Sequence, residues 1–250
     1  MLRWLAPLTV FAMLVACTTT SERRYEAQIK KAATFNAELG AGYLARGNLE
    51  QAKVKFEKAL DQDEENAKAN SGYALLQARL GNHEEADTYF ERAIELDPDD
   101  SQVLNNYGAY LCDQGRSDDA EMHFLKAAAD PLYGTPEFAY RNAGTCALSD
   151  GDISKAKSYF QRALEINPRF GPALLDMANI NREQRQFQPA LTYLERYHKI
   201  FPQSPESLWL YAGIYRDLGN RDLASTYETR LTTLFPQSAQ ARRLRESAVQ

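Results

Sequence analysis

Small apolar residues recur at a fixed interval along most of this chain, each followed by a large apolar residue. One alanine returns every 34 residues, with a single interval of 36, at Ala52, Ala86, Ala120, Ala156, Ala190 and Ala224. Four residues after the first five of these stand Phe56, Phe90, Phe124, Phe160 and Leu194. Residues i and i+4 share one face of an α-helix, so each repeat predicts a helix with an apolar face. A glycine five residues before most of these alanines predicts a turn from a preceding helix.

A repeat of this length predicts stacked helix pairs, because a single pair cannot bury its apolar face alone. The small, aromatic, small pattern and the closing prolines, such as Pro98 and Pro168, resemble the tetratricopeptide repeat over nearly all of the chain after residue 32. The resemblance implies an all-α fold. We expect a right-handed superhelical solenoid of six tetratricopeptide helix pairs plus a C-terminal capping helix, with a concave and a convex surface.

The positions of the repeated residues predict where each repeat begins and ends. The six repeats are expected at 33–66, 67–100, 101–136, 137–170, 171–204 and 205–236, after a tether at 17–32 and before a capping helix at 237–250. Two extra residues of the third repeat fall in a loop from Asp130 to Pro136. Arg185 replaces the turn glycine and Glu228 replaces the aromatic residue, so we expect less regular packing toward the C-terminus.

The N-terminus has the layout of a secretory signal peptide, in which Arg3 precedes an apolar stretch at residues 4–15. This stretch is shorter than the roughly 20 residues of a membrane-spanning helix. The tetrad Leu14-Val15-Ala16-Cys17 resembles the lipobox of bacterial lipoproteins. The resemblance implies that residues 1–16 are removed and that Cys17 carries a covalent lipid. The alternative is ordinary signal-peptide cleavage, which would leave an unpaired thiol.

Composition narrows the classes of function. The chain is 44% hydrophobic and 25% charged, and its formal charge of -5 argues against general nucleic-acid binding. Three scattered histidines lack the spacing of metal ligands, and no phosphate loop or nucleophile elbow occurs in the sequence. We therefore expect a protein that is no enzyme, binds no nucleic acid, metal or small-molecule substrate, and has no cofactor apart from the lipid on Cys17.

The two remaining cysteines fall on the first helices of neighbouring repeats, Cys112 in the third and Cys146 in the fourth. Equivalent helices of adjacent repeats lie about 8 to 10 Å apart, so the two sulfurs can meet. In an oxidising periplasm a disulfide would contribute about 3 kcal/mol of stability. The alternative is a pair of buried thiols that pack as small hydrophobic residues.

The tetratricopeptide family binds partners in a groove lined by the first helices. Its groove positions give the candidate partner-binding residues Ala37, Ala41, Leu44, Lys68, Ser71, Leu75 and Asn105, with Ala45, Arg79 and Gln102 in the same register. The first repeat offers an almost wholly apolar strip, which would accept an amphipathic helix or a short extended segment. Two alternatives are that residues 21–32 fold back over the strip and that its small residues serve only packing. Trp209 is either a further partner anchor or a residue that packs on the C-terminal cap.

The whole arrangement, from lipobox to repeats, is similar to the type IV pilus biogenesis and stability lipoproteins, the pilotins of the pilus secretin (the PilF/PilW family). The likeness includes the stretch from Asn105 to Cys112 in the third repeat. It implies a lipid-anchored, periplasm-facing outer-membrane protein whose partner is an outer-membrane secretin subunit and whose only membrane contact is the lipid. By resemblance to enterobacterial-type sorting, Thr18 after the lipidated cysteine favours the outer membrane. The alternative is a lipoprotein scaffold for another envelope or cell-wall assembly complex.

Overall fold

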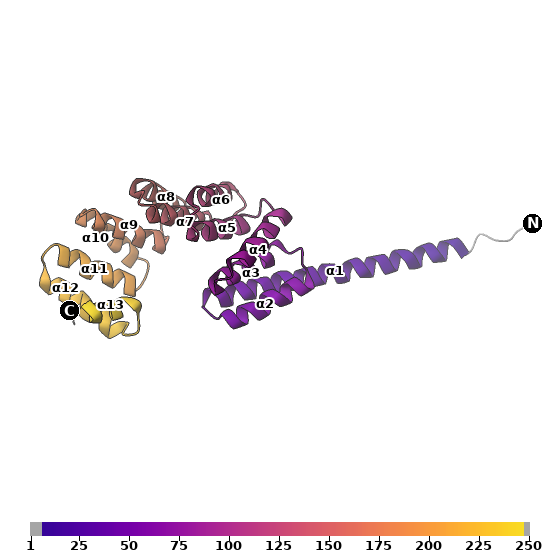
Figure 1. Ribbon diagram of the computed structural model, residues 1–250, viewed down its shortest axis with the longest axis horizontal. Coiled ribbons are helices and arrows are strands. Elements are labelled where there is room, and N and C mark those ends of the chain that lie inside the picture. Colours follow the sequence, from indigo (N-terminus) through magenta and orange to yellow (C-terminus); the bar gives the residue numbers. More distant parts are fainter. Residues whose placement is uncertain (1–6, 248–250) are drawn as a thin grey trace, which may run out of the picture. The chain divides into compact units, whose positions relative to one another are not determined.

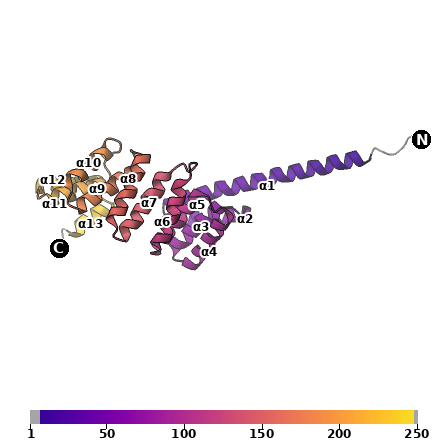
Figure 2. The same ribbon diagram turned by 90° about the horizontal axis from the view of Figure 1, so that it is seen from above.

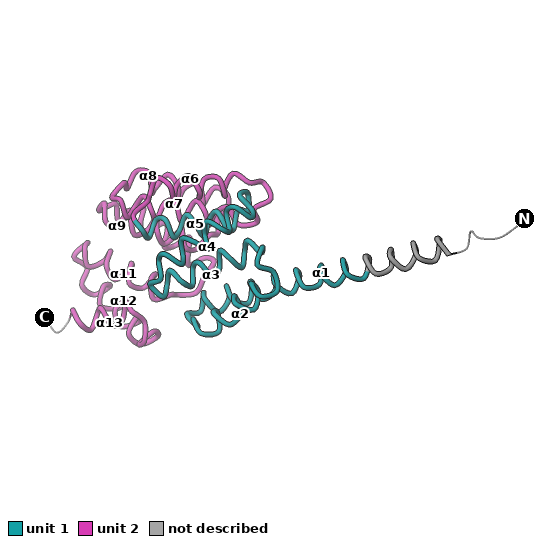
Figure 3. Tube along the Cα trace, turned by 45° about the vertical axis from the view of Figure 1, so that its right-hand side comes forward, with its two compact units in different colours: residues 1–114 teal, residues 115–250 magenta. Residues whose placement is uncertain are grey.

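The chain is helical throughout the part that the structure describes. The computed structural model describes the backbone of residues 7–247 and the side chains of residues 21–247. Within residues 7–247 it contains thirteen α-helices and no β-strand. They fall into two compact units, Met1–Gln114 and Gly115–Gln250, here called unit 1 and unit 2 (Figure 3). The predicted all-α fold is confirmed.

Unit 1 holds the first five helices (Figure 1). They are α1 (Pro7–Ala45), α2 (Leu49–Gln62), α3 (Ala67–Leu80), α4 (His83–Leu96) and α5 (Ser101–Asp113). The pairs α1 with α2 and α3 with α4 are hairpins, and α3 contacts both α1 and α5. The first helices of three repeats therefore lie side by side within this unit.

Helix α1 is much longer than a repeat requires. It runs unbroken from Pro7 to Ala45, so residues 21–32 continue the first repeat helix beyond its hairpin (Figures 1 and 2). Residues 21–28 are all exposed. The alternative in which residues 21–32 fold back over the first repeat is therefore wrong, and the expected tether is helical. The signal peptide and the Cys17 side chain lie outside the described side chains, so lipidation stays a prediction.

Unit 2 holds the remaining eight helices. They are α6 (Ser117–Ala129), α7 (Pro136–Ser149), α8 (Ile153–Ile166), α9 (Gly171–Glu183), α10 (Phe187–His198), α11 (Pro205–Asp217), α12 (Arg221–Leu234) and α13 (Ala239–Ser247). The last of these, α13, caps the preceding hairpin, because Ala241 is buried in one cluster with Leu208 and Leu231. Trp209 is partly buried against the same cluster, which supports its packing role rather than that of a partner anchor.

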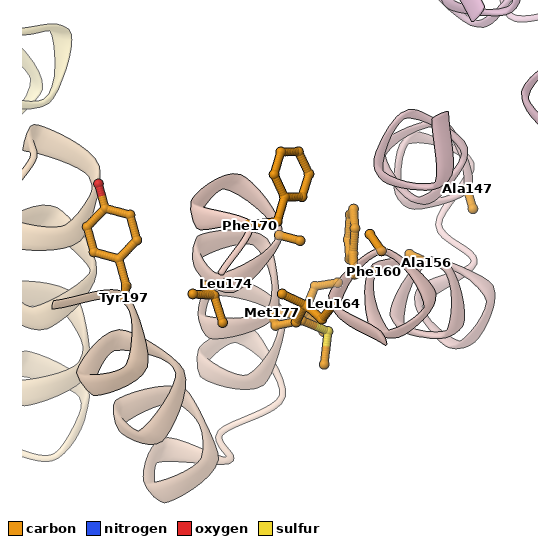
Figure 4. Close-up of a cluster of buried hydrophobic side chains, with 11 residues drawn as sticks. Ala147, Ala156, Phe160, Leu164, Phe170, Leu174, Met177 and Tyr197 are labelled. Carbon is orange, nitrogen blue, oxygen red and sulfur yellow. The ribbon is translucent and has the colours of Figure 1, made fainter. Parts of the chain in front are cut away.

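The repeated alanines and aromatic residues form the core of both units. None of the aligned residues is more than 4% exposed: Ala52, Ala86, Ala120, Ala156, Ala190, Ala224, Phe56, Phe90, Phe124, Phe160 and Leu194. In unit 2, Phe160 packs in one cluster with Leu164, Phe170 and Met177 (Figure 4). Burying one such side chain contributes about 1.5 to 3 kcal/mol relative to leaving it exposed, so the repeat pattern carries much of the stability.

The turn inside each hairpin needs a residue in the left-handed region. Gly47, Gly81, Gly115, Gly151 and Gly219 have φ values from +74° to +85°. Arg185 takes the same place in the fifth repeat with φ of 59°, as the one non-glycine residue with positive φ in the described chain. A side chain in this region costs roughly 1 to 2 kcal/mol. The departure at Arg185 thus changes the energy of one turn and leaves Leu194 of that repeat fully buried.

Two histidines of unit 2 are half-buried, in places where their charged forms are disfavoured. Burial lowers the pKa of His198, and a hydrogen bond to the backbone of Phe201 opposes this shift. Burial also lowers the pKa of His123. In the unfolded chain both histidines should have a pKa of about 6.5. Below that pH the unfolded chain binds more protons than the folded chain. The free energy of unfolding should therefore decrease as the pH is lowered, until the pH is below the folded pKa values as well.

The substitution His198→Phe should make this loss of stability at low pH smaller. The imidazole stacks on Tyr211 with ring centroids 5.5 Å apart, and its Nε2 has no hydrogen-bond partner among the described residues. Phenylalanine can keep the stacking but cannot bind a proton. Urea unfolding at neutral pH and at about pH 5 measures the difference. A difference as large in the variant as in the wild type would contradict this role of His198.

Candidate functional site

The side of unit 1 formed by α1, α3 and α5 carries an open groove of about 320 Å³. Five of the candidate residues line it, namely Ala37, Ala41, Leu44, Lys68 and Leu75. Ala45, Arg79 and Gln102, which share their register, line it as well. The exposed surface of this lining is mainly apolar, although Glu38, Lys68 and Arg79 add charges, so the groove suits an amphipathic segment with an apolar face.

The floor of the groove includes the fully buried ring of Phe56, which reaches from α2 to both α1 and α3. A Cβ added at Gly40 of α1 would lie 2.8 Å from this ring, and one added at Gly72 of α3 would lie 2.2 Å from it. Only glycine leaves room for the ring on both sides. Phe56 and Gly72 were not expected in the groove, although glycines on the two helices that face a repeat aromatic were a usable signal.

Two candidate residues lie outside the groove lining. Ser71 is fully buried and its Oγ accepts a hydrogen bond from Asn106 Nδ2 at 3.1 Å. Asn105 is buried, and its neighbour Asn106 lines the groove instead. Gln102 Nε2 donates to Asn106 Oδ1 at 3.0 Å. The polar edge of the groove therefore falls one residue later on α5 than the repeat register predicted.

Two cations at the rim of the groove have partners in the protein. Lys68 Nζ lies 3.7 Å from Asp100 Oδ2. Arg79 Nη1 donates to the backbone oxygen of Leu44 at 3.0 Å, which satisfies a carbonyl near the end of α1. A hollow of about 370 Å³ continues past Leu44 and Arg79 to α5. The two hollows share this boundary, so one partner segment can occupy both.

Unit 2 has a hollow of about 350 Å³ with a more polar lining. Arg141 Nε donates to Asp176 Oδ2 at 2.6 Å, so two lining residues form an ion pair. Burial raises the pKa of Asp176, and Arg141 opposes this shift. Tyr197 and Phe201 supply apolar surface beside the pair. An ion pair between two lining residues therefore occupies this hollow, whereas the exposed surface of the unit 1 groove is mainly apolar.

The two candidate disulfide cysteines belong to different units. Cys112 lies near the end of α5 in unit 1, and Cys146 is buried in α7 of unit 2. Their pairing stays a prediction.

The described residues show few features of other kinds of site. Within them, no group of three or more histidine, cysteine, aspartate or glutamate side chains is placed to hold a metal ion. None of the described helices combines the length and the apolar character that crossing a bilayer requires. The groove in unit 1, which brings together five of the candidate residues, is the candidate functional site.

Comparison with known proteins agrees with this fold. One family model described as tetratricopeptide repeat matches residues 43–105 and 147–197, and a second model of the same description matches residues 89–122. The paired helices, the repeat core and the groove thus define a tetratricopeptide-repeat protein.

Solved structures and sequence relatives show which family of tetratricopeptide-repeat proteins this chain resembles. The type IV pilus assembly protein PilF of Pseudomonas aeruginosa is 31% identical over 153 residues, which span 61% of this chain and 61% of that protein. The solved structure of Pseudomonas aeruginosa PilF has a TM-score of 0.69 at 31% identity and aligns with 88% of this chain and 99% of its own. PilW, a widely conserved type IV pilus biogenesis factor, has a TM-score of 0.72 at 30% identity, over 85% and 97% of the two chains. The chain belongs to the family of tetratricopeptide-repeat type IV pilus biogenesis proteins that includes PilF and PilW.

Proposed function

We propose that this protein is a lipid-anchored pilotin, which supports assembly, outer-membrane localisation and stability of the type IV pilus secretin. Membership of the PilF and PilW family supports the proposal. The observation that carries it is the mainly apolar groove of unit 1, whose α1 wall belongs to the helix that contains Cys17. The groove would hold a secretin segment while the lipid keeps both at the membrane.

The groove fits binding better than catalysis. Its wall of small residues, such as Ala41 and Ala45, lets the backbone of a bound helix or extended segment come close. Leu44 and Leu75 then bury apolar surface of the partner, at about 25 cal/mol for each Å² removed from water. The lipid on Cys17 is the only covalent group that this mechanism needs. With two or three acyl chains, such an anchor holds stably at a membrane.

Removal of the lipid tests the proposal. In a strain that carries Cys17→Ser, with residues 1–16 exchanged for an ordinary cleaved signal peptide, we expect the protein in the periplasmic fraction. Secretin multimers should then be missing from the outer membrane or lie elsewhere, because the groove no longer travels with an anchor. Fractionation and detection of secretin multimers measure this. Thr18→Ser, which keeps the lipidation site, is the control. Normal outer-membrane multimers in the Cys17→Ser strain would refute the proposal.

A further inference from the structure

The exposed extension of α1 has a charge opposite to that of the rest of unit 1. Residues 21–32 contain four basic and two acidic residues, a net charge of +2. Residues 33–114 contain 7 basic and 16 acidic residues, a net charge of -9. A membrane with anionic headgroups therefore attracts the extension and repels the remainder of the unit.

The four basic residues of the extension lie on one side of the helix. Arg23 and Lys30 are seven residues apart, as are Arg24 and Lys31, and seven residues make about two helical turns. All four side chains are exposed. In the described part of the chain, none of them forms an ion pair with a carboxylate. This basic face, meaning Arg23, Arg24, Lys30 and Lys31, is therefore available to an external anion.

The basic face lies on the same side of α1 as the groove. Lys30 precedes Ala37 by seven residues, and Ala37 precedes Leu44 by seven. Both Ala37 and Leu44 line the groove. Since α1 is unbroken, this seven-residue line runs along one side of a single helix.

We infer that the basic face of α1 binds the anionic phospholipid surface of the membrane that holds the Cys17 lipid. The inference rests on the lipid anchor of the proposed function. At a rise of about 1.5 Å per residue, Arg23 lies about 9 Å and Lys31 about 21 Å from Cys17 along the helix axis. When α1 lies along the bilayer surface, headgroups near the inserted lipid are within reach of all four side chains. A lipid combined with a basic patch is a recurring way to hold a protein at an anionic surface.

This contact gives the anchored protein an orientation. With the basic face on the bilayer, the α1 wall of the groove turns toward the same surface. A partner segment that emerges from the membrane then meets the groove directly. The membrane contact extends beyond the lipid chains, which the sequence alone led us to expect as the only one.

The test separates the basic face from the lipid. The probe is the mature chain from residue 17 with Cys17→Ser, sedimented with vesicles of phosphatidylcholine containing one-third phosphatidylglycerol. We expect binding at low salt, loss of binding at high salt, and no binding to phosphatidylcholine alone. Each basic residue near such a surface contributes about fivefold, from about 1 kcal/mol. The combined variant R23Q, R24Q, K30Q and K31Q should therefore bind at least tenfold more weakly.

A control variant removes positive charge elsewhere in unit 1. The triple variant K53Q, K55Q and K58Q removes positive charges from α2 and should bind like the parent chain, with circular dichroism confirming the helix content of both variants. Equal sedimentation with neutral and anionic vesicles would overturn the inference. So would unchanged vesicle binding of the four-site variant, since the basic face would then take no part in membrane contact. The assay contains no secretin, so its failure would leave the proposed pilotin role standing.

Discussion

The substitution Ala41→Glu should weaken binding of the secretin by about tenfold or more and leave the protein folded. Ala41 is exposed and lines the groove, so the new side chain extends into the groove rather than into the core. A partner segment that covers this position with its apolar face must remove the new carboxylate from water and supplies no cation to pair with it. Such a group costs roughly 1 to 3 kcal/mol or more, and each 1.4 kcal/mol is tenfold in affinity. The dissociation constant between the mature protein and purified secretin is the measurement.

A second variant shows whether the groove or the added charge causes the effect. Val54→Glu adds the same charge on α2, where the valine is 50% exposed and does not line the groove. It should bind the secretin like the wild type. Leu44→Glu is a poorer test, because Leu44 is only 6% exposed and its replacement would also disturb the core. Weak binding by Val54→Glu together with normal binding by Ala41→Glu would move the partner site to α2.

The helix pairs could be predicted from sequence because the same pattern of core residues recurs in each of the six repeats. Each aligned alanine and aromatic residue needs only its own hairpin and the next one to become buried. That local requirement is met at Phe56, Phe90 and Phe160 alike, and all three are fully or almost fully buried. The groove positions of the tetratricopeptide family identified the α1 and α3 walls of the groove, since Ala41 and Leu75 face a direction fixed by their place in the helix.

Features that depend on contacts between particular helices could not be predicted as well. Successive residues of a helix point about 100° apart, so a position that is wrong by one residue faces another direction: the edge expected at Asn105 lies at Asn106, although Gln102 of the same register lines the groove. The groove floor needs two helices to approach Phe56 closely, and no single repeat contains that information. Residues 21–32 have no repeat register at all. Their helix follows from many good helix formers and the lack of glycine or proline between Cys17 and Leu39.

The substitution Gly72→Leu should destabilise the protein by about 3 kcal/mol or more. Its Cβ alone would lie 2.2 Å from Cε1 and 2.6 Å from Cζ of Phe56. The ring is fully buried and has Gly40 on its other side, where an added Cβ would be 2.8 Å away, so it has no free space to move into. The helix propensity of leucine is more favourable than that of glycine by about 0.8 kcal/mol, which offsets only part of this cost. Urea unfolding of the mature protein measures the free energy.

The chain offers a matched control in Gly42, which lies on α1 of the same unit. The nearest atoms to a Cβ there are in the flexible Arg46 side chain at 3.8 Å, so Gly42→Leu should be neutral or slightly stabilising. Combining Gly72→Leu with Phe56→Leu should cost less than the sum of the two single changes, because the smaller side chain relieves the overlap. Additive costs would mean that Phe56 does not set the limit at Gly72, and the account of the groove floor would then be wrong.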